Sequence, residues 1–367
     1  MLRAGIVGLP NVGKSTLFNA LTRTRKAEAA NYPFCTIEPN VGVVTVPDAR
    51  LEPLARLAGS AVAVPAAIEL VDIAGLVRGA SRGEGLGNRF LAHIREVDAI
   101  VEVVRCFEDP DVVHVEAELR PTSDIETIQI ELVLADLDSM ARQKERLERN
   151  AKSGERSARA EVELAARLIA HLDGGRPALT LELTPEERAR ARSFSLLTMK
   201  PTLFACNLAE GDLAFAAEHP LVAEVARWAA AHRDAATVAV SARIEAELAE
   251  LPEGEARDYL AALGVEESGV GQLIRAVHGL LGLRTFFTAN EKEARAWTIP
   301  AGTTAQRAAG VVHSDFERGF VRAEAVPAAA LIRAGTWAHA RELGLTRMEG
   351  REYVVGDGDV LHFRHSA

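Results

Sequence analysis

Gly8-Leu9-Pro10-Asn11-Val12-Gly13-Lys14-Ser15-Thr16 is a complete phosphate-binding loop, and it begins after only seven residues of the chain. The apolar stretch 4–7 before it predicts a short buried strand, and the stretch 16–21 after it predicts the start of a helix. In that setting the glycines let successive backbone N–H groups point at a β-phosphate, which the positive end of the helix dipole also attracts. Lys14 supplies a compact charge for the β- and γ-phosphates, and Ser15 supplies a hydroxyl for Mg²⁺. The stretch therefore predicts a nucleoside triphosphate site in which residues Asn11 to Thr16 contact the phosphates.

The length and composition of the chain are those of an ordinary globular protein of two or three domains. It has 367 residues, of which 48% are hydrophobic and 26% charged, so neither a disordered chain nor a fibrous repeat is indicated. Its apolar stretches are far shorter than the ~20 residues that a membrane helix needs, and the first strand begins too early to leave room for a signal peptide. The three cysteines, Cys35, Cys106 and Cys206, are too far apart for a disulfide framework or a zinc site. We expect a cytoplasmic protein with no membrane partner.

Short apolar runs alternate with helical patterns through most of the chain, which is typical of a mostly parallel sheet covered by helices. The candidate strands are 2–7, 41–46, 67–71, 99–104, 201–206 and 237–240. The phosphate-binding loop follows the first of them. We therefore predict an α/β P-loop domain, or G domain, that is made of residues 1–124 and 200–282.

Two other parts of the chain depart from this alternation. Between about 124 and 200 apolar residues recur at helical spacing on both sides of a polar turn at 150–154, which predicts a helical hairpin domain inserted at 125–199. Within it, Thr184-Pro185-Glu186-Glu187 predicts the start of one more short helix. The third domain, residues 283–367, is predicted to be a small α+β domain, because brief β-like runs alternate there with turn residues. These runs are 298–302, 310–312, 319–323, 353–355 and 360–363.

Charge is unevenly distributed along the chain. The net charge is −10, which argues against DNA binding, because binding without regard to sequence depends on neutralising phosphates. Residues 142–160, around the tip of the predicted hairpin, nonetheless carry +4, so the remainder carries −14. A run of this kind is usually a solvated helix face. The alternative is a basic tip that docks on RNA.

The run Val71-Asp72-Ile73-Ala74-Gly75 closes a candidate strand with an aspartate and a nearby glycine. Downstream of a phosphate-binding loop, such an aspartate holds a Mg²⁺-bound water, and the glycine N–H meets the γ-phosphate. We predict that Asp72 and Thr36 complete the metal site with Ser15. Lys14, Thr36 and Gly75 are the predicted catalytic contacts.

Two residues of this region bear on the rate of hydrolysis. Leu76 stands where Ras-like enzymes carry a water-orienting glutamine, so we expect hydrolysis to be slow. Asn11 is a candidate ligand for a monovalent cation that would help to neutralise the phosphates. Its alternative role is to shape the turn of the loop.

Asn207-Leu208-Ala209-Glu210 follows the candidate strand 201–206, at the position where common GTPases carry Asn-Lys-x-Asp. The aspartate of that motif accepts hydrogen bonds from the N1–H and the 2-amino group of guanine. Glu210 is one methylene longer and Leu208 replaces the lysine, so a guanine contact is poorly placed and adenine is the better candidate. Ser241 and Ala242 follow another candidate strand and are expected to supply a backbone contact to the base. ATP should therefore bind more tightly than GTP.

With these motifs the chain resembles the Obg-like ATPase family, the YchF proteins, over nearly its whole length. The resemblance rests on the phosphate-binding loop, on the Asp72–Val77 stretch and on the Asn207-x-x-Glu210 variant. Further matching stretches are 31–40, 85–88, 104–107, 295–297, 302–305, 308–310 and 313–320. The resemblance implies a G domain, an inserted helical hairpin and a C-terminal TGS domain of the β-grasp type. It also implies a preference for ATP, Mg²⁺, stimulation by K⁺ and association with ribosomes.

The same resemblance makes His114 a candidate catalytic histidine. From the sequence alone, a histidine between two valines is more often a core or edge residue, so both roles stay open.

We therefore expect a slow, Mg²⁺-dependent ATPase that works as a nucleotide switch on the ribosome or its large subunit, with a regulatory role in translation or the stress response. One alternative is a GTPase translation factor of the same fold. The other is a non-catalytic module that senses ATP and docks a partner, an alternative that Leu76 keeps open. Titration with ATP and GTP distinguishes the expected ATPase from the GTPase translation factor.

Overall fold

The computed structural model describes residues 2–23, 40–73, 86–109, 119–151, 156–231 and 235–366. The chain divides into two compact units. The first unit is Met1–Val43 with Glu69–Leu280, and the second unit is Val44–Ile68 with Leu281–Ala367. Two of the boundaries between the units fall inside strands. The boundary after Val43 lies in β2 (Val41–Val46), and the boundary after Ile68 lies in β4 (Ala66–Asp72).

The first unit contains a sheet with the strand order β2-β4-β1-β5-β6-β7. The other strands are β1 (Arg3–Val7), β5 (Ala99–Arg105), β6 (Thr202–Asn207) and β7 (Ala236–Val240). The pairs β1–β4, β1–β5, β5–β6 and β6–β7 are parallel. Every residue of β5 is buried, as expected for a central parallel strand that is covered on both faces. The six strands predicted from the apolar runs are confirmed to within one residue at each end, and so is the α/β fold class.

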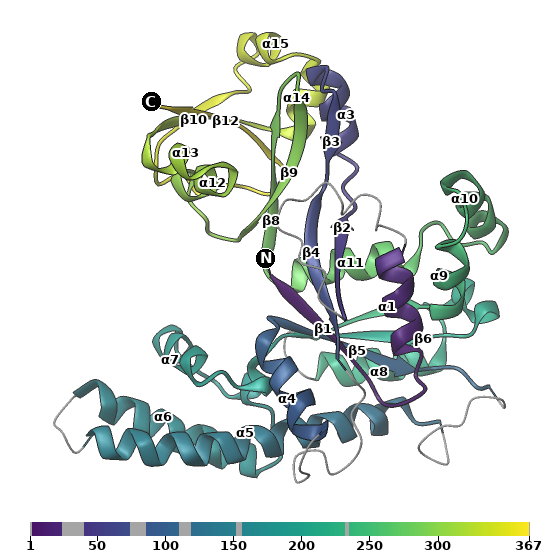
Figure 1. Cartoon of the computed structure of the whole chain (residues 1–367), viewed down its shortest axis with the longest axis vertical. Helices are drawn as coiled ribbons and strands as arrows, with labels where there is room; N and C mark the ends of the chain where they lie inside the picture. The colour runs from purple at the N-terminus through teal and green to yellow at the C-terminus, as the bar shows by residue number, and fades with distance from the viewer. Residues whose placement is uncertain are drawn as a thin grey trace. The chain divides into compact units, whose positions relative to one another are not determined.

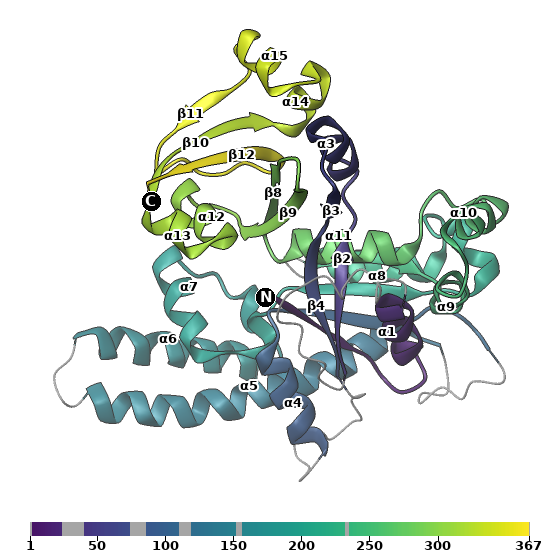
Figure 2. The ribbon, with the colours of Figure 1, turned by 45° about the horizontal axis from the view of Figure 1, so that its top comes forward.

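Helices lie on both sides of this sheet (Figures 1 and 2). They are α1 (Lys14–Arg23), α4 (Leu86–Glu96), α8 (Pro220–Ala230), α9 (Ala242–Leu248), α10 (Glu253–Ala262) and α11 (Gly269–Leu280), with the 3₁₀ turn η4 (Glu210–Phe215). Because α1 starts directly after the loop that follows β1, its N-terminus faces the carboxyl end of the parallel strands. Ligands of open α/β sheets bind at that edge.

The predicted hairpin is present as α5 (Pro121–Ala151) and α6 (Arg156–Asp173), which lie side by side in both views (Figures 1 and 2). Met140 and Leu147 of α5 are buried in one apolar cluster with Leu164 and Leu168 of α6. The carboxylate of Asp136 accepts hydrogen bonds from the backbone N–H groups of Leu197 and Thr198 and from the Thr198 hydroxyl. These bonds attach α5 to the chain segment that returns to β6.

That returning segment contains η1 (Ala178–Thr180), α7 (Pro185–Ala191), η2 (Arg192–Phe194) and η3 (Leu197–Met199). Helix α7 begins where the sequence predicts a short helix. The Thr184 hydroxyl accepts the N–H of Glu187, whose carboxylate accepts the N–H of Thr184. This reciprocal capping box satisfies two N–H groups that the helix itself cannot.

The second unit contains a mixed sheet with the strand order β11-β10-β12-β8-β9-β3. Its strands are β3 (Val62–Val64), β8 (Leu283–Ala289), β9 (Glu293–Pro300), β10 (Phe320–Pro327), β11 (Arg347–Glu349) and β12 (Asp359–His365). Its helices are α3 (Leu51–Ala58), α12 (Ala305–Val312), α13 (Ser314–Arg318), α14 (Ala328–Ala334) and α15 (Trp337–Glu342). Phe286, Phe320 and Phe363 lie in its core. The predicted α+β character is present, while the TGS assignment stays a prediction.

Two features of this unit differ from the sequence analysis. Residues 310–312, predicted as a β-like run, are helical in α12, because Ala305, Ala308 and Ala309 recur at helical spacing and are fully buried. Residues 44–68, which we placed in the P-loop domain, belong to the second unit. The reason is that β3 pairs in parallel with β9, and the Ser60 hydroxyl donates to the Asn290 carbonyl oxygen at 2.6 Å.

Among the described helices, none is both long enough and apolar enough to cross a bilayer. Within the same residues, His, Cys, Asp and Glu side chains nowhere gather in groups of three or more that could hold a metal ion.

Candidate nucleotide-binding site

The loop between β1 and α1 has the backbone shape that its sequence predicts. Asn11 and Gly13 have φ angles of 64° and 91°, in the left-handed region that asparagine tolerates and glycine adopts freely. A Cβ atom at Gly13 would overlap the amide of Asn207, and one at Gly8 would lie 2.9 Å from the carbonyl oxygen of Val103. Both positions therefore require glycine.

Lys14 and Asp72 meet at the phosphate end of this loop. The Lys14 ammonium forms an ion pair with the Asp72 carboxylate, and Lys14 is only 8% exposed. The backbone N–H of Asp72 donates to the carbonyl oxygen of Asn40 at 2.8 Å. The cavity there has a volume of about 570 Å³ and is lined by Leu9, Pro10, Asn11, Gly13, Lys14, Ser15, Thr16, Asn40 and Asp72. It has the size and the polar lining expected of a small-ligand site.

Asn207, the last residue of β6, connects the phosphate-binding loop to the start of α9. Its side-chain N–H donates to the carbonyl oxygen of Val12 at 2.9 Å, and its side-chain oxygen accepts the backbone N–H of Ala242 at 2.9 Å. Asn207 is 4% exposed, so these bonds are shielded from water. Asn207 and Ala242 are predicted from the sequence as neighbours of the base. The structure joins them to each other and to the loop.

A second cavity, with a volume of about 440 Å³, borders the same loop. It is lined by Asn11, Gly13, Thr16, Phe107, Glu108, Asp109, Asn207, Leu208, Ala209, Glu210, Ala242 and Arg243. Asn11, Gly13 and Thr16 line both cavities. A ligand that spans them would place one end against Lys14 and the other near Glu210.

The carboxylate of Glu210 is approached by side chains from two helices. The Tyr259 hydroxyl of α10 lies 3.4 Å from one oxygen, and the Arg243 Nε atom of α9 lies 4.0 Å from the other. The same two side chains also contact Glu247, at 2.8 Å and 3.4 Å. The hydrogen bond to Glu247 raises the pKa of Tyr259 to about 12, so its hydroxyl stays a donor at neutral pH.

The chain matches two families in separate parts. A family described as a 50S ribosome-binding GTPase matches residues 3–136, and the YchF-GTPase C-terminal family, described as a protein of unknown function, matches residues 283–366. The ribosome-binding ATPase YchF of Bacillus subtilis is 50% identical over 363 residues, which cover 99% of each chain. The chain belongs to the YchF family. The ribosome-binding ATPase YchF of Escherichia coli O157:H7 is 48% identical to this chain over 361 residues, with 98% of each chain covered.

The solved structure of the Schizosaccharomyces pombe YchF GTPase shares this fold. It is 34% identical, has a TM-score of 0.87, and the match covers 99% of this chain and 97% of that one. Membership of the YchF family confirms the resemblance that the motifs indicated and the P-loop GTPase type of the first unit.

Several predicted site residues of this YchF family member lie outside the described residues. They are Thr36, Gly75 and His114, together with Leu76. Within the described part, Lys14, Ser15 and Asp72 line one cavity, while their roles at the phosphates and the metal stay predictions. Leu208 and Glu210 line the other, although the side chain of Leu208 is 2% exposed and packs in an apolar cluster. Ser241 is fully buried, and it is its neighbour Ala242 that lines the second cavity.

Phe107, Arg243 and Tyr259 are site residues that the sequence did not predict. The guanidinium of Arg105 lies 4.5 Å from the centre of the Phe107 ring and donates to the Phe107 carbonyl oxygen at 3.1 Å, which holds this aromatic ring at the second cavity. The Val104–Phe107 stretch was noted only as a family match. Arg243 and Tyr259 have no motif of their own, because their roles depend on how α9 and α10 fold back onto Glu210.

Proposed function

We propose that this protein is a Mg²⁺-dependent, slow ATPase that associates with ribosomes. The observation that carries the proposal is that the two cavities meet at Asn11, Gly13 and Thr16, with Lys14 at one end and Glu210 at the other. This arrangement suits a nucleoside triphosphate with its phosphates on the loop and its base beside Glu210. The names of the B. subtilis and E. coli relatives, ribosome-binding ATPase YchF, support the proposal.

The donor set at the phosphate end fits Mg²⁺. The Ser15 hydroxyl and the Asp72 carboxylate line one cavity, and such hard oxygen donors are what Mg²⁺ prefers beside phosphates. Ser15 would bind the ion directly, Asp72 would hold one of its waters, and Thr36 would complete the set. When bound, the ion neutralises charge on the phosphates. Lys14, now paired with Asp72, would turn to the β- and γ-phosphates.

Three further roles belong to the same proposal. Gly75 would donate its N–H to the γ-phosphate, and His114 would act near the attacking water, a role drawn from the family resemblance alone. Asn11 would hold a K⁺ ion against the phosphates. If Asn11→Ala keeps full stimulation of turnover by K⁺ over Na⁺, the role of Asn11 is wrong.

The preference for ATP rests on Glu210. A carboxylate beside the base can accept a hydrogen bond from the 6-amino group of adenine, whereas guanine carries an acceptor oxygen at that position. The GTPase alternative remains a specific competitor, because the S. pombe structure is described as a GTPase.

Competition binding tests the proposal on the full-length protein. ATP should displace a fluorescent ATP analogue at a concentration at least tenfold lower than GTP does, and ATP should be hydrolysed slowly in the presence of Mg²⁺. Lys14→Ala should abolish tight binding, because it removes a charge-assisted phosphate contact. Equal or better displacement by GTP would establish the GTPase alternative. Tight ATP binding without any phosphate release would establish the non-catalytic module.

A further inference from the structure

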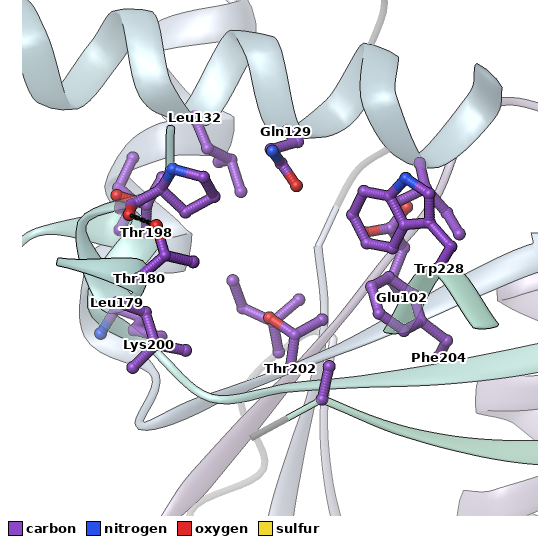
Figure 3. Close-up of a pocket in the computed structure, with 15 residues that line it drawn as sticks. Glu102, Gln129, Leu132, Leu179, Thr180, Thr198, Lys200, Thr202, Phe204 and Trp228 are labelled. Atoms are coloured by element: carbon purple, nitrogen blue, oxygen red, sulfur yellow. Dashed lines mark hydrogen bonds between the residues drawn. The ribbon is translucent and has the colours of Figure 1, made fainter. Parts of the chain in front are cut away.

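A third cavity, smaller than the two at the nucleotide site, lies in the first unit and shares none of their lining residues. It has a volume of about 60 Å³ and is enclosed by β5 and β6 of the sheet, by α5 and α8, and by the η1–η3 segment (Figure 3). Most of its wall is apolar, from Ile100, Ile125, Leu132, Leu179, Leu197 and Phe204. The volume is that of about four water molecules. A ligand of a few heavy atoms would fill it.

Glu102 lines this cavity from the middle of the central strand β5 (Figure 3). It is 5% exposed, and within the described part of the chain its carboxylate makes no hydrogen bond. A buried carboxylate of this kind costs several kcal/mol if it is ionised without a partner. Burial, together with the charge of Asp124, therefore raises the pKa of Glu102 well above its ordinary value.

Among the described residues, no positive charge compensates Glu102. Asp124, at the start of α5, is a second carboxylate and is 3% exposed. Lys200 lines the cavity too, but its ammonium donates to the carbonyl oxygens of Arg95 and Val97. The carboxylates that act on the pKa of Lys200 are Asp98 and Asp136 rather than Glu102. Lys200 therefore does not neutralise Glu102, and a cation bound at this end of the cavity would favour the ionised carboxylate.

The remaining wall suits an alkyl chain that carries a positive charge. Trp228 and Phe204 flank Glu102 (Figure 3), and their rings pack edge to face with centroids 5.4 Å apart. Aromatic rings attract alkylammonium groups and also cover hydrocarbon. Gln129 and Thr202 add uncharged polar groups to the lining. The described residues offer only two neighbouring carboxylates here, which is too few oxygen ligands for a divalent metal ion.

We propose that this cavity binds a small organic cation of the alkylammonium class, with its ammonium group at Glu102 and its hydrocarbon chain against Trp228 and Phe204. The cation supplies a partner that the described residues do not give this buried carboxylate. Glu102 lies in register with Val7, the last residue of β1 before the phosphate-binding loop, and α5 is the first helix of the hairpin. The site is independent of the proposed nucleotide chemistry.

Isothermal titration calorimetry with n-butylammonium chloride tests the proposal on the full-length protein at constant ionic strength. The wild type should show saturable binding of one equivalent, at least tenfold tighter than binding of n-butanol, which has the same chain and no charge. Glu102→Gln, which keeps the side-chain size, should weaken binding of the cation at least tenfold. Glu126→Gln is the matched control, because Glu126 is an exposed carboxylate on α5. It should leave binding unchanged.

The tryptophan fluorescence, to which Trp228 contributes along with Trp297 and Trp337, gives a second readout of the same titration. Thermal unfolding establishes that each variant is folded, and the comparison of butylammonium with butanol on the wild type needs no variant at all. Absence of saturable binding, equal binding of the alcohol, or equal binding by folded Glu102→Gln would overturn the proposal. Absence of binding would leave the cavity as a place for solvent, and equal binding of the alcohol would make it a site for uncharged alkyl groups.

Discussion

Asn207 shows how one side chain connects parts of the nucleotide site that are far apart in the sequence. Its side chain forms hydrogen bonds with Val12 in the loop and with Ala242 at the start of α9. Val12 and Asn207 are nearly two hundred positions apart in the chain. Because all three groups are buried, the orientation of the loop depends on this amide. Asn207, which the sequence predicts as part of a base-recognition motif, therefore also holds the phosphate-binding loop to α9.

Asn207→Ala should reduce ATP affinity at least tenfold. It leaves the Val12 carbonyl oxygen and the Ala242 N–H without their partner, at about 1–3 kcal/mol for each buried group, and it also frees the loop. Competition binding of the fluorescent analogue measures the loss. Asn19→Ala is the control, since Asn19 is exposed on α1. Wild-type affinity in folded Asn207→Ala would show that the loop keeps its shape without the amide.

Glu210→Asp should shift the preference toward GTP by about tenfold, or roughly 1.4 kcal/mol. The shorter carboxylate withdraws from Tyr259 and Arg243 and takes the length that GTPases use for guanine. Leu208→Lys is a poor companion change, because Leu208 is buried and a lysine there would bury its ammonium. The ratio of the ATP and GTP competition constants is the measurement. Glu218→Asp, an exposed change in the same unit, should leave the ratio unchanged.

At the scale of elements, the sequence predicts best what is decided by neighbouring residues. The strand–loop–helix of the phosphate site and the start of α7 at Thr184 are local patterns, and both are present. Val311 and Val312 favour a strand by their own preference, but the buried alanines of α12 decide for helix. The positions of Tyr259 and Arg243 beside Glu210 depend on the packing of helices that are far apart in the sequence. A single sequence carries no local signal for such packing.

Glu245 links α9 to α11, and it predicts a pH-dependent stability. Its carboxylate accepts the N–H of Gly269 at 2.7 Å, and burial raises its pKa to about 7. Between about pH 4.5 and 7 the folded state therefore holds a proton that the unfolded state has lost, so this group's contribution to stability falls as the pH rises. The full difference is about 3 kcal/mol, at 1.36 kcal/mol for each pKa unit.

Glu245→Gln should remove this pH dependence. Glutamine keeps the acceptor for Gly269 and carries no charge, so the variant should equal the wild type near pH 4.5 and exceed it by about 3 kcal/mol above pH 7. Urea unfolding at intervals of one pH unit measures the difference. Glu218→Gln controls for the loss of one surface charge. A difference between wild type and Glu245→Gln that stays constant with pH would contradict the shifted pKa.

At the scale of the whole molecule, charge is concentrated on the hairpin. The segment 142–160 carries +4 in a chain with a net charge of −10, and it spans the end of α5 and the start of α6. Arg149 is exposed near the end of α5. A basic projection on an acidic chain favours contact with RNA through the projection alone, because only there does the protein meet phosphate without repulsion.

Reversal of Arg149, Lys152 and Arg156 to glutamate should weaken sedimentation with purified ribosomes at least tenfold and flatten its dependence on salt, because each lost phosphate contact lowers the salt slope by about one. The pelleted fraction is measured with ATP, ADP and no nucleotide at several salt concentrations.

The matched control reverses Arg190, Arg192 and Arg227. These residues are exposed in the first unit outside the segment 142–160, and their reversal changes the net charge by the same amount. If both triple variants lose binding equally, net charge rather than the tip governs association. If the tip variant pellets like the wild type at every salt concentration, the basic segment is a solvated helix face and the ribosome contact lies elsewhere.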